Sequence, residues 1–91
     1  MNRLKEISRV LSKIDDESLI EKFLNSILTS KEVEEISSRW ELVKLLDEGV
    51  SQRKVAETLG LSLCKITRGS RELKKKPSAF KTIIDAFRSL D

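Results

Sequence analysis

The sequence predicts a small all-α protein of six helices, two of which form a helix-turn-helix at residues 51–75. Apolar residues recur at three- and four-residue steps along the chain, as they do on amphipathic helices. No segment alternates apolar and polar residues for long enough to predict a strand. We expect the 91 residues to form a single domain, 1–91, with one small core that a second copy would enlarge.

Six segments have the spacing and the capping residues of helices. They span about residues 2–14, 16–28, 30–48, 52–59, 63–75 and 79–90. Each of the last five follows a residue whose side chain can accept a hydrogen bond from the first free backbone N–H groups. These residues are Asp15 or Asp16, Thr29 in a capping box with Glu32, Ser51, Ser62 and Ser78. Gly49, Gly60 and Pro77 suit the helix ends that precede them.

The apolar residues of each predicted helix share one face, which we expect to be buried. In the first three helices they are Leu4, Ile7, Val10, Leu11 and Ile14, then Leu19, Ile20, Phe23, Leu24, Ile27 and Leu28, then Val33, Ile36, Trp40, Val43 and Leu46. The last helix contributes Ala79, Phe80, Ile83, Ile84, Phe87 and Leu90. The stripes of the terminal helices are large for so short a chain, and we expect both helices to pack across a dimer interface.

The turn Gly60-Leu61-Ser62 joins two short helices, as in a helix-turn-helix. Gly60 can adopt the left-handed conformation that redirects the chain. Ala56 is small enough to let the two helices approach, and an apolar contact between them is expected from Val55, Leu59 and Ile66.

Charge is concentrated on this motif. Residues 51–76 hold eight Lys or Arg and two Glu, whereas the rest of the chain has ten basic and thirteen acidic residues. A basic stretch on an otherwise acidic protein is typical of a nucleic-acid surface. A solvated helix face can be equally basic, and an αα-hairpin can have a glycine turn without binding DNA. The turn, the small inner residue, the caps and the charge together favour DNA.

The second helix of the motif is expected to lie in the major groove. Base-edge contacts are predicted for Ser62, Leu63, Cys64, Lys65 and Thr67. Phosphate contacts are predicted for Gln52, Arg53, Lys54 and Lys74, and Arg71 belongs to the same DNA-binding set. Gly69 is unusual in this helix because an interior glycine costs about 1 kcal/mol relative to alanine. We expect something flat to approach the backbone there.

Other classes of function are disfavoured. The chain has one cysteine, Cys64, and no histidine, so it offers neither a Cys/His nucleophilic pair nor a usual zinc site. We therefore expect no enzymatic activity, no metal and no cofactor. No secretory signal and no apolar run of membrane-spanning length is present, so we expect a cytoplasmic protein without a membrane partner.

Several short motifs resemble the tryptophan-operon repressor family. They are Ser51-Gln52-Arg53, Leu59-Gly60, Ile66-Thr67-Arg68-Gly69-Ser70, Leu73-Lys74 and Pro77, with Leu24-Asn25, Leu28-Thr29, Arg39 and Gly49 upstream. The resemblance covers about residues 23–90. It implies an intertwined homodimer of six-helix subunits that binds operator DNA with L-tryptophan as co-repressor.

The resemblance also implies a ligand site. The guanidinium planes of Arg39 and Arg68 would sandwich the indole ring, with Gly69 against it, and Thr29 and Arg68 would hold the carboxylate. Backbone carbonyls near Ser26 and Leu28 of the other subunit would receive the ammonium group. Glu72 stands where the family often has a serine. It could accept a hydrogen bond from the ammonium, pair with Arg68, or face solvent.

The sequence thus predicts a repressor of tryptophan biosynthesis or uptake genes. One alternative is a helix-turn-helix regulator of the same superfamily that responds to no small molecule. Another is a helical adaptor whose basic face meets an acidic protein partner.

Overall fold

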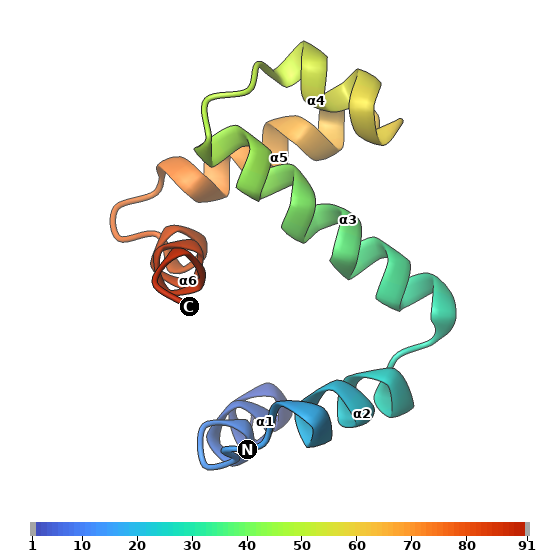
Figure 1. The fold of residues 1–91 in the computed structure, drawn as a ribbon, viewed down its shortest axis with the longest axis vertical. Helices are drawn as coiled ribbons and strands as arrows, with labels where there is room; N and C mark the ends of the chain where they lie inside the picture. The colour runs from blue at the N-terminus through green and yellow to red at the C-terminus, as the bar shows by residue number, and fades with distance from the viewer. Residues whose placement is uncertain (1, 91) are drawn as a thin grey trace. The chain divides into compact units, whose positions relative to one another are not determined.

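The computed structural model describes residues 2–90, which form six α-helices and no strand. The helices are α1 (Arg3–Leu11), α2 (Glu17–Ile27), α3 (Ser30–Asp47), α4 (Gln52–Leu59), α5 (Leu63–Lys74) and α6 (Ala79–Arg88) (Figure 1). The predicted all-α class is confirmed, and most of the helix ends lie within two residues of the prediction. The chain divides into two compact units, Met1–Glu34 and Glu35–Asp91. No helix among residues 2–90 is long and apolar enough to cross a membrane.

The first unit contains α1, α2 and the start of α3. The carboxamide of Asn2 caps α1 by accepting from the N–H groups of Leu4 and Lys5 at 2.9 and 3.2 Å. The helix ends earlier than predicted because the chain tightens, and the Ile14 N–H donates to the carbonyl three residues before it, at 3.1 Å. Asp16 caps α2 through the Leu19 N–H. No residue of α1 or α2 is fully buried. Part of their apolar surface is half-buried, whereas Leu4, Val10 and Leu19 are at least half exposed.

The predicted capping box of α3 is confirmed. The Thr29 hydroxyl accepts from the Glu32 N–H at 3.1 Å, and the Glu32 carboxylate accepts from the Thr29 N–H at 2.8 Å. Two of the free donors at the start of the helix are satisfied in this way.

The second unit has the core of the protein. Its fully buried residues are Leu42, Val43, Val55, Ile66 and Ile84, so that each of α3, α4, α5 and α6 contributes. The prediction for α3 was wrong in part, because Ile36 is half exposed whereas Leu42, outside the predicted stripe, is buried. The C-terminal half of α3 is packed on more than one side. Apolar residues around it therefore become covered, and a single stripe does not describe it.

Two glycines turn the chain around α4. Gly49 follows α3 with φ of 93°, and Gly60 ends α4 with φ of 63°. Both values lie in the left-handed region that favours glycine. The Leu61 N–H donates to the carbonyl of Ala56 at 3.2 Å and closes the turn. The left-handed Gly60 predicted from the sequence is confirmed.

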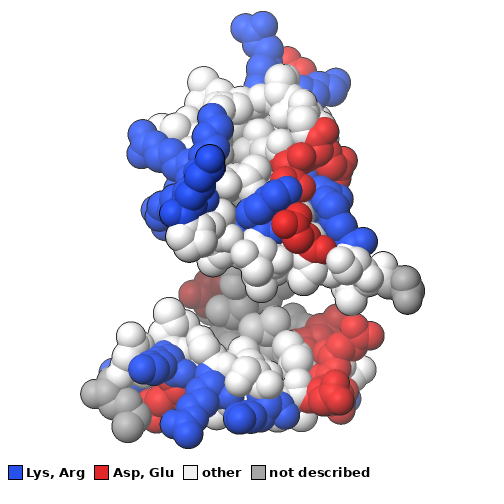
Figure 2. All heavy atoms as spheres, turned by 90° about the vertical axis from the view of Figure 1, so that its left-hand side faces the viewer, with Lys and Arg blue, Asp and Glu red and all other residues white. Residues whose placement is uncertain are grey.

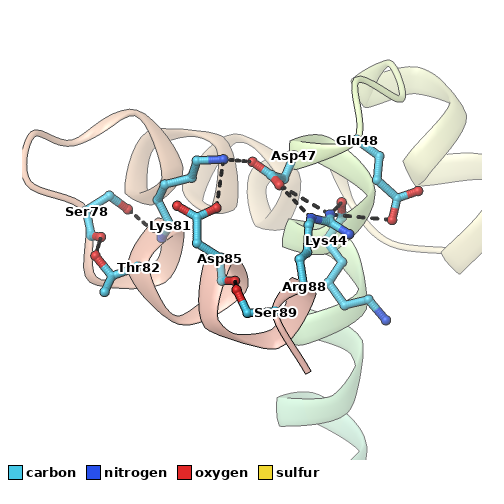
Figure 3. Close-up of polar contacts among 9 residues, drawn as sticks. All are labelled: Lys44, Asp47, Glu48, Ser78, Lys81, Thr82, Asp85, Arg88 and Ser89. Carbon is cyan, nitrogen blue, oxygen red and sulfur yellow. Dashed lines mark hydrogen bonds and ion pairs between the residues drawn. The ribbon is translucent and has the colours of Figure 1, made fainter. Parts of the chain in front are cut away.

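An ionic cluster joins α6 to the end of α3 (Figure 3). Asp47 accepts from Lys81 at 2.8 Å and from the guanidinium of Arg88 at 3.2 Å. Lys81 also pairs with Asp85, and Arg88 with Glu48. The hydrogen bond from Lys81, supported by Arg88, holds the pKa of the Asp47 carboxyl below its ordinary value, against the opposing effect of burial.

Aromatic contacts reinforce this attachment of α6. Trp40 of α3 stacks on Phe80, with ring centroids 6.3 Å apart, and meets Phe87 edge-on at 5.7 Å. Trp40 is therefore a packing residue, as the sequence predicted.

Candidate DNA interface and ligand cavity

The helix-turn-helix is formed by α4 and α5. Val55 and Ile66 are fully buried between the elements of this unit, and Ala56 and Leu59 are partly buried. The Ser51 hydroxyl caps α4 by accepting from the Lys54 N–H at 3.2 Å. Ser62 occupies the N-cap position of α5 with extended backbone, but its side chain makes no capping hydrogen bond, contrary to expectation. Its hydroxyl remains available to another partner.

All ten residues predicted to contact DNA are exposed. They are Gln52, Arg53 and Lys54 on α4, Ser62 at the turn, and Leu63, Cys64, Lys65, Thr67, Arg71 and Lys74 on α5. Leu63 is 64% exposed in the first turn of α5. An apolar side chain at the tip of a recognition helix can contact a thymine methyl group.

Apart from Lys75, which pairs with Glu72, the basic residues of this motif have no acidic partners within residues 2–90. Arg53, Lys54, Lys65, Arg71 and Lys74 take part in none of the ion pairs there, which instead involve Lys44, Lys75, Lys81 and Arg88. In the upper part of Figure 2, basic side chains gather on one side and acidic and basic side chains mix on the other. Unpaired cations on an exposed helix pair are suited to phosphates.

A small cavity lies between α3 and α5, behind the exposed face of the recognition helix. Its volume is about 70 Å³. The lining residues are Arg39, Leu42, Val43, Lys65, Arg68, Gly69, Glu72 and Phe80. Four of the seven predicted ligand residues, Arg39, Arg68, Gly69 and Glu72, are thus brought together.

Sequence reasoning missed part of this lining. Lys65 was assigned to DNA alone, and Phe80 only to packing. Lys65 lies three residues before Arg68, four before Gly69 and seven before Glu72, and this helical spacing could have placed it on the same face. Lys65 is therefore both exposed on the predicted DNA-binding surface and part of the cavity wall.

The structure explains why residue 69 is a glycine. Gly69 is buried, and a Cβ atom added to it would meet Leu42 Cδ2 closer than unbonded carbons approach, with Val43 Cγ2 at 3.4 Å. The group that approaches the backbone at Gly69 is thus the surface of α3, on which α5 packs. Its backbone still lines the cavity.

Glu72 pairs with Lys75 and not with Arg68. The Lys75 Nζ lies 2.7 Å from the Glu72 carboxylate, three residues away on the same helix. This hydrogen bond lowers the pKa of Glu72 below its ordinary value, with a further contribution from the charges of Lys75 and Arg68 and some opposition from desolvation. Glu72 is only partly exposed and is not a fully solvated surface residue.

The other three predicted ligand residues, Ser26, Leu28 and Thr29, belong to the first unit. The Ser26 hydroxyl donates to the carbonyl of Lys22 at 2.8 Å, and Thr29 is in the capping box. The carbonyl oxygens of Ser26 and Leu28 accept no hydrogen bond from the described residues. They are among the acceptors that every helix end leaves free.

The sequence is similar to one known protein family and to several curated proteins. The sequence pattern of the family described as Trp repressor protein matches residues 2–88. The Trp operon repressor homolog of Chlamydia trachomatis is 34% identical over 74 residues, which make up 80% of this chain and 79% of that protein. The homolog of Xylella fastidiosa is 39% identical over 66 residues, with 71% and 72% covered. The homolog of Chlamydia caviae is 38% identical over 74 residues, with 80% and 73% covered.

No solved structure matches the chain. The family match nevertheless spans nearly the whole sequence, and the exposed basic helix-turn-helix is the part of the structure that a regulator of transcription requires. The chain belongs to the Trp repressor family, a family of DNA-binding repressors and not of enzymes.

Proposed function

We propose that this protein is a homodimeric, cytoplasmic repressor that binds operators of tryptophan biosynthesis or uptake genes with L-tryptophan as co-repressor. The observation that carries the ligand assignment is the cavity behind α5, where Arg39 and Arg68 meet beside Gly69 and Glu72. Two guanidinium groups can stack on an aromatic ring and bind a carboxylate. The names of the relatives, which are Trp operon repressor homologs, support the same class of target gene.

A ligand in this cavity would act directly on the recognition helix. Lys65, Arg68 and Glu72 all lie on α5 and all line the cavity, and α5 also carries the predicted base-edge contacts. A ligand wedged between α3 and α5 would fix the angle at which α5 leaves the core. Tryptophan would then raise DNA affinity by favouring the orientation that fits the groove.

The cavity alone is too small for an amino acid with an indole ring. Its volume is about 70 Å³, against roughly 300–1,000 Å³ for typical ligand pockets. A wall supplied by a second subunit would complete it. The family resemblance assigns that wall to the backbone carbonyls of Ser26 and Leu28, which accept no hydrogen bond from the described residues of their own chain.

Uncovered apolar surface supports the homodimer independently. In the first unit α1 and α2 line an apolar groove of about 500 Å³, and Leu4, Val10 and Leu19 are each at least half exposed. On α6, Ile83 is 56% exposed. Such patches on a small protein mark interaction sites, and a second copy would cover both.

Calorimetric titration with L-tryptophan tests the co-repressor assignment. Calorimetry is preferable to fluorescence because Trp40 and the ligand carry the same chromophore. We expect binding by the wild type, loss of binding in Arg39→Ala, and retained binding in the matched control Arg53→Ala, which changes an arginine that is not part of the cavity lining.

DNA binding by the same proteins completes the test. Tryptophan should tighten binding of the wild type to a duplex selected from a random-sequence pool. Arg39→Ala should bind that duplex as the wild type does without tryptophan. If the wild type binds DNA but takes up no tryptophan, the protein is instead a ligand-independent regulator. If it binds no DNA at any salt concentration, the adaptor hypothesis is favoured.

A further inference from the structure

Glu72 belongs to two neighbourhoods at once. On one side it lines the cavity together with three cations, Arg39, Lys65 and Arg68, and it is the only acidic residue among the described residues of that lining. On the other side its carboxylate is held by Lys75 at 2.7 Å. One carboxylate therefore connects the ligand cavity to the end of the recognition helix.

The cavity lining separates charge in a way that suits a zwitterionic amino acid. A ligand carboxylate is attracted to the three cations, and a ligand ammonium has only Glu72 among these side chains as a charged acceptor. The hydrogen bond from Lys75 lowers the pKa of Glu72, so the Glu72 carboxylate is negatively charged near neutral pH.

The Lys75 side chain could contact a DNA phosphate when it is not paired with Glu72. It is 62% exposed, and it lies between Lys74 and Lys76 at the end of α5. Lys74 and Lys76 take part in no ion pair within residues 2–90, so Lys75 is the one lysine of this run that an acid holds there. An ion pair as exposed as this one is weak, and a competing cation can replace it.

We propose that Glu72 couples ligand binding to DNA binding by exchanging Lys75 for the ammonium group of the co-repressor, which frees Lys75 to contact a phosphate. This proposal rests on the proposed function. It makes Glu72 a residue that selects ligands with an amino group, and it makes Lys75 a conditional DNA contact. Any DNA contact made by the neighbouring Lys76 would not depend on the ligand.

The salt dependence of DNA binding measures the exchange. Each phosphate contact to duplex DNA contributes about 0.9 to the slope of log affinity against log salt. With saturating L-tryptophan, the slope of the wild type should steepen by about 0.9 for each subunit beyond any change from other contacts. With saturating indole-3-propionate, which lacks the amino group, this increment should be absent.

Matched variants isolate the contribution of Lys75. In Lys75→Ala, the tryptophan-dependent steepening should be smaller than in the wild type by about 0.9 for each subunit. The control Lys76→Ala removes an adjacent lysine without an acidic partner. Its salt slope should be shallower than that of the wild type both with and without tryptophan, and the steepening caused by tryptophan should be the same as in the wild type. In Glu72→Gln, Lys75 is free from the start, so the ligand-free slope should already exceed that of the wild type.

The possible failures are distinguishable. If calorimetry shows that the wild type does not bind tryptophan, the proposed function fails; the ligand-free comparison of Glu72→Gln with the wild type still tests whether Glu72 restrains Lys75. If tryptophan binds and tightens DNA binding, but Lys75→Ala steepens as much as the wild type, the exchange is overturned while the co-repressor assignment stands. Equal ligand-free slopes for Glu72→Gln and the wild type would also overturn it.

Discussion

Replacing Gly69 by alanine tests the packing of the recognition helix on α3. The added methyl group would enter space that Leu42 Cδ2 already occupies, and it would lie 3.4 Å from Val43 Cγ2. Leu42 is only 1% exposed, so it can move only against its core neighbours or into the small cavity that it lines. Overfilling a packed core in this way costs about 1–3 kcal/mol.

A second effect opposes the first. Alanine is the better helix former, by about 1 kcal/mol in a helix interior. Because the contact with Leu42 is closer than unbonded carbons allow, we place the overpacking cost in the upper half of its range. The net expectation is a loss of about 1–2 kcal/mol in the free energy of unfolding, or a Tm lower by roughly 4–16 °C for a protein of this size.

Thermal unfolding followed by far-ultraviolet circular dichroism measures this loss, at one fixed protein concentration because a dimer's Tm depends on it. The control places Gly69→Ala in a Leu42→Val background, which removes Leu42 Cδ2 at a cost of about 1 kcal/mol. There the alanine has room, and it should be neutral or stabilising. A higher Tm for Gly69→Ala alone, or an equal loss in both backgrounds, would refute the packing argument.

Three further outcomes are expected. Asp47→Asn should lower the Tm at neutral pH by a few degrees, because ion pairs whose cations remain 37–48% exposed contribute little. Since the pKa of Asp47 is lowered in the folded state, this stabilisation is present above the ordinary value of 3.8 and should fade as the pH falls below it, which Tm measurements along a pH series would show. Lys74→Ala should reduce the salt slope of DNA binding by about 0.9 per subunit with unchanged base preference, whereas Thr67→Val should alter base preference in a selection from random duplexes; the reverse pattern would exchange their roles. Val10→Glu should shift the protein towards monomer in light scattering at micromolar concentration, and an unchanged dimer would exclude α1 from the interface.

The helices and their caps could be predicted because their signals are local. The Thr29–Glu32 capping box and the left-handed Gly60 each depend on a few neighbouring residues, and both are present as expected. The exposure of the residues predicted to contact DNA could also be predicted, because they are the outer side of short amphipathic helices whose inner residues, Val55 and Ile66, are buried.

The remaining features depend on which helices meet, and a single sequence does not specify that. Leu42 is buried because α5 crosses α3 at Gly69, a contact between residues far apart in the chain. Helical spacing offered Arg68 as one possible partner of Glu72, but Lys75 is equally within reach on the helix and forms the pair. The volume of the cavity likewise follows from the distance between helices.

The incompletely buried apolar faces of α1 and α2 have a consequence for the synthesis of the protein. An element with no buried side chain gains little from folding by itself, so in a dimer the first unit would acquire most of its stability when the second chain arrives. Maturation of the repressor would then be a bimolecular reaction, slow when the chains are scarce. Newly synthesised monomers would be the form most open to proteases, and the cellular level of active repressor would fall more steeply than the rate of synthesis.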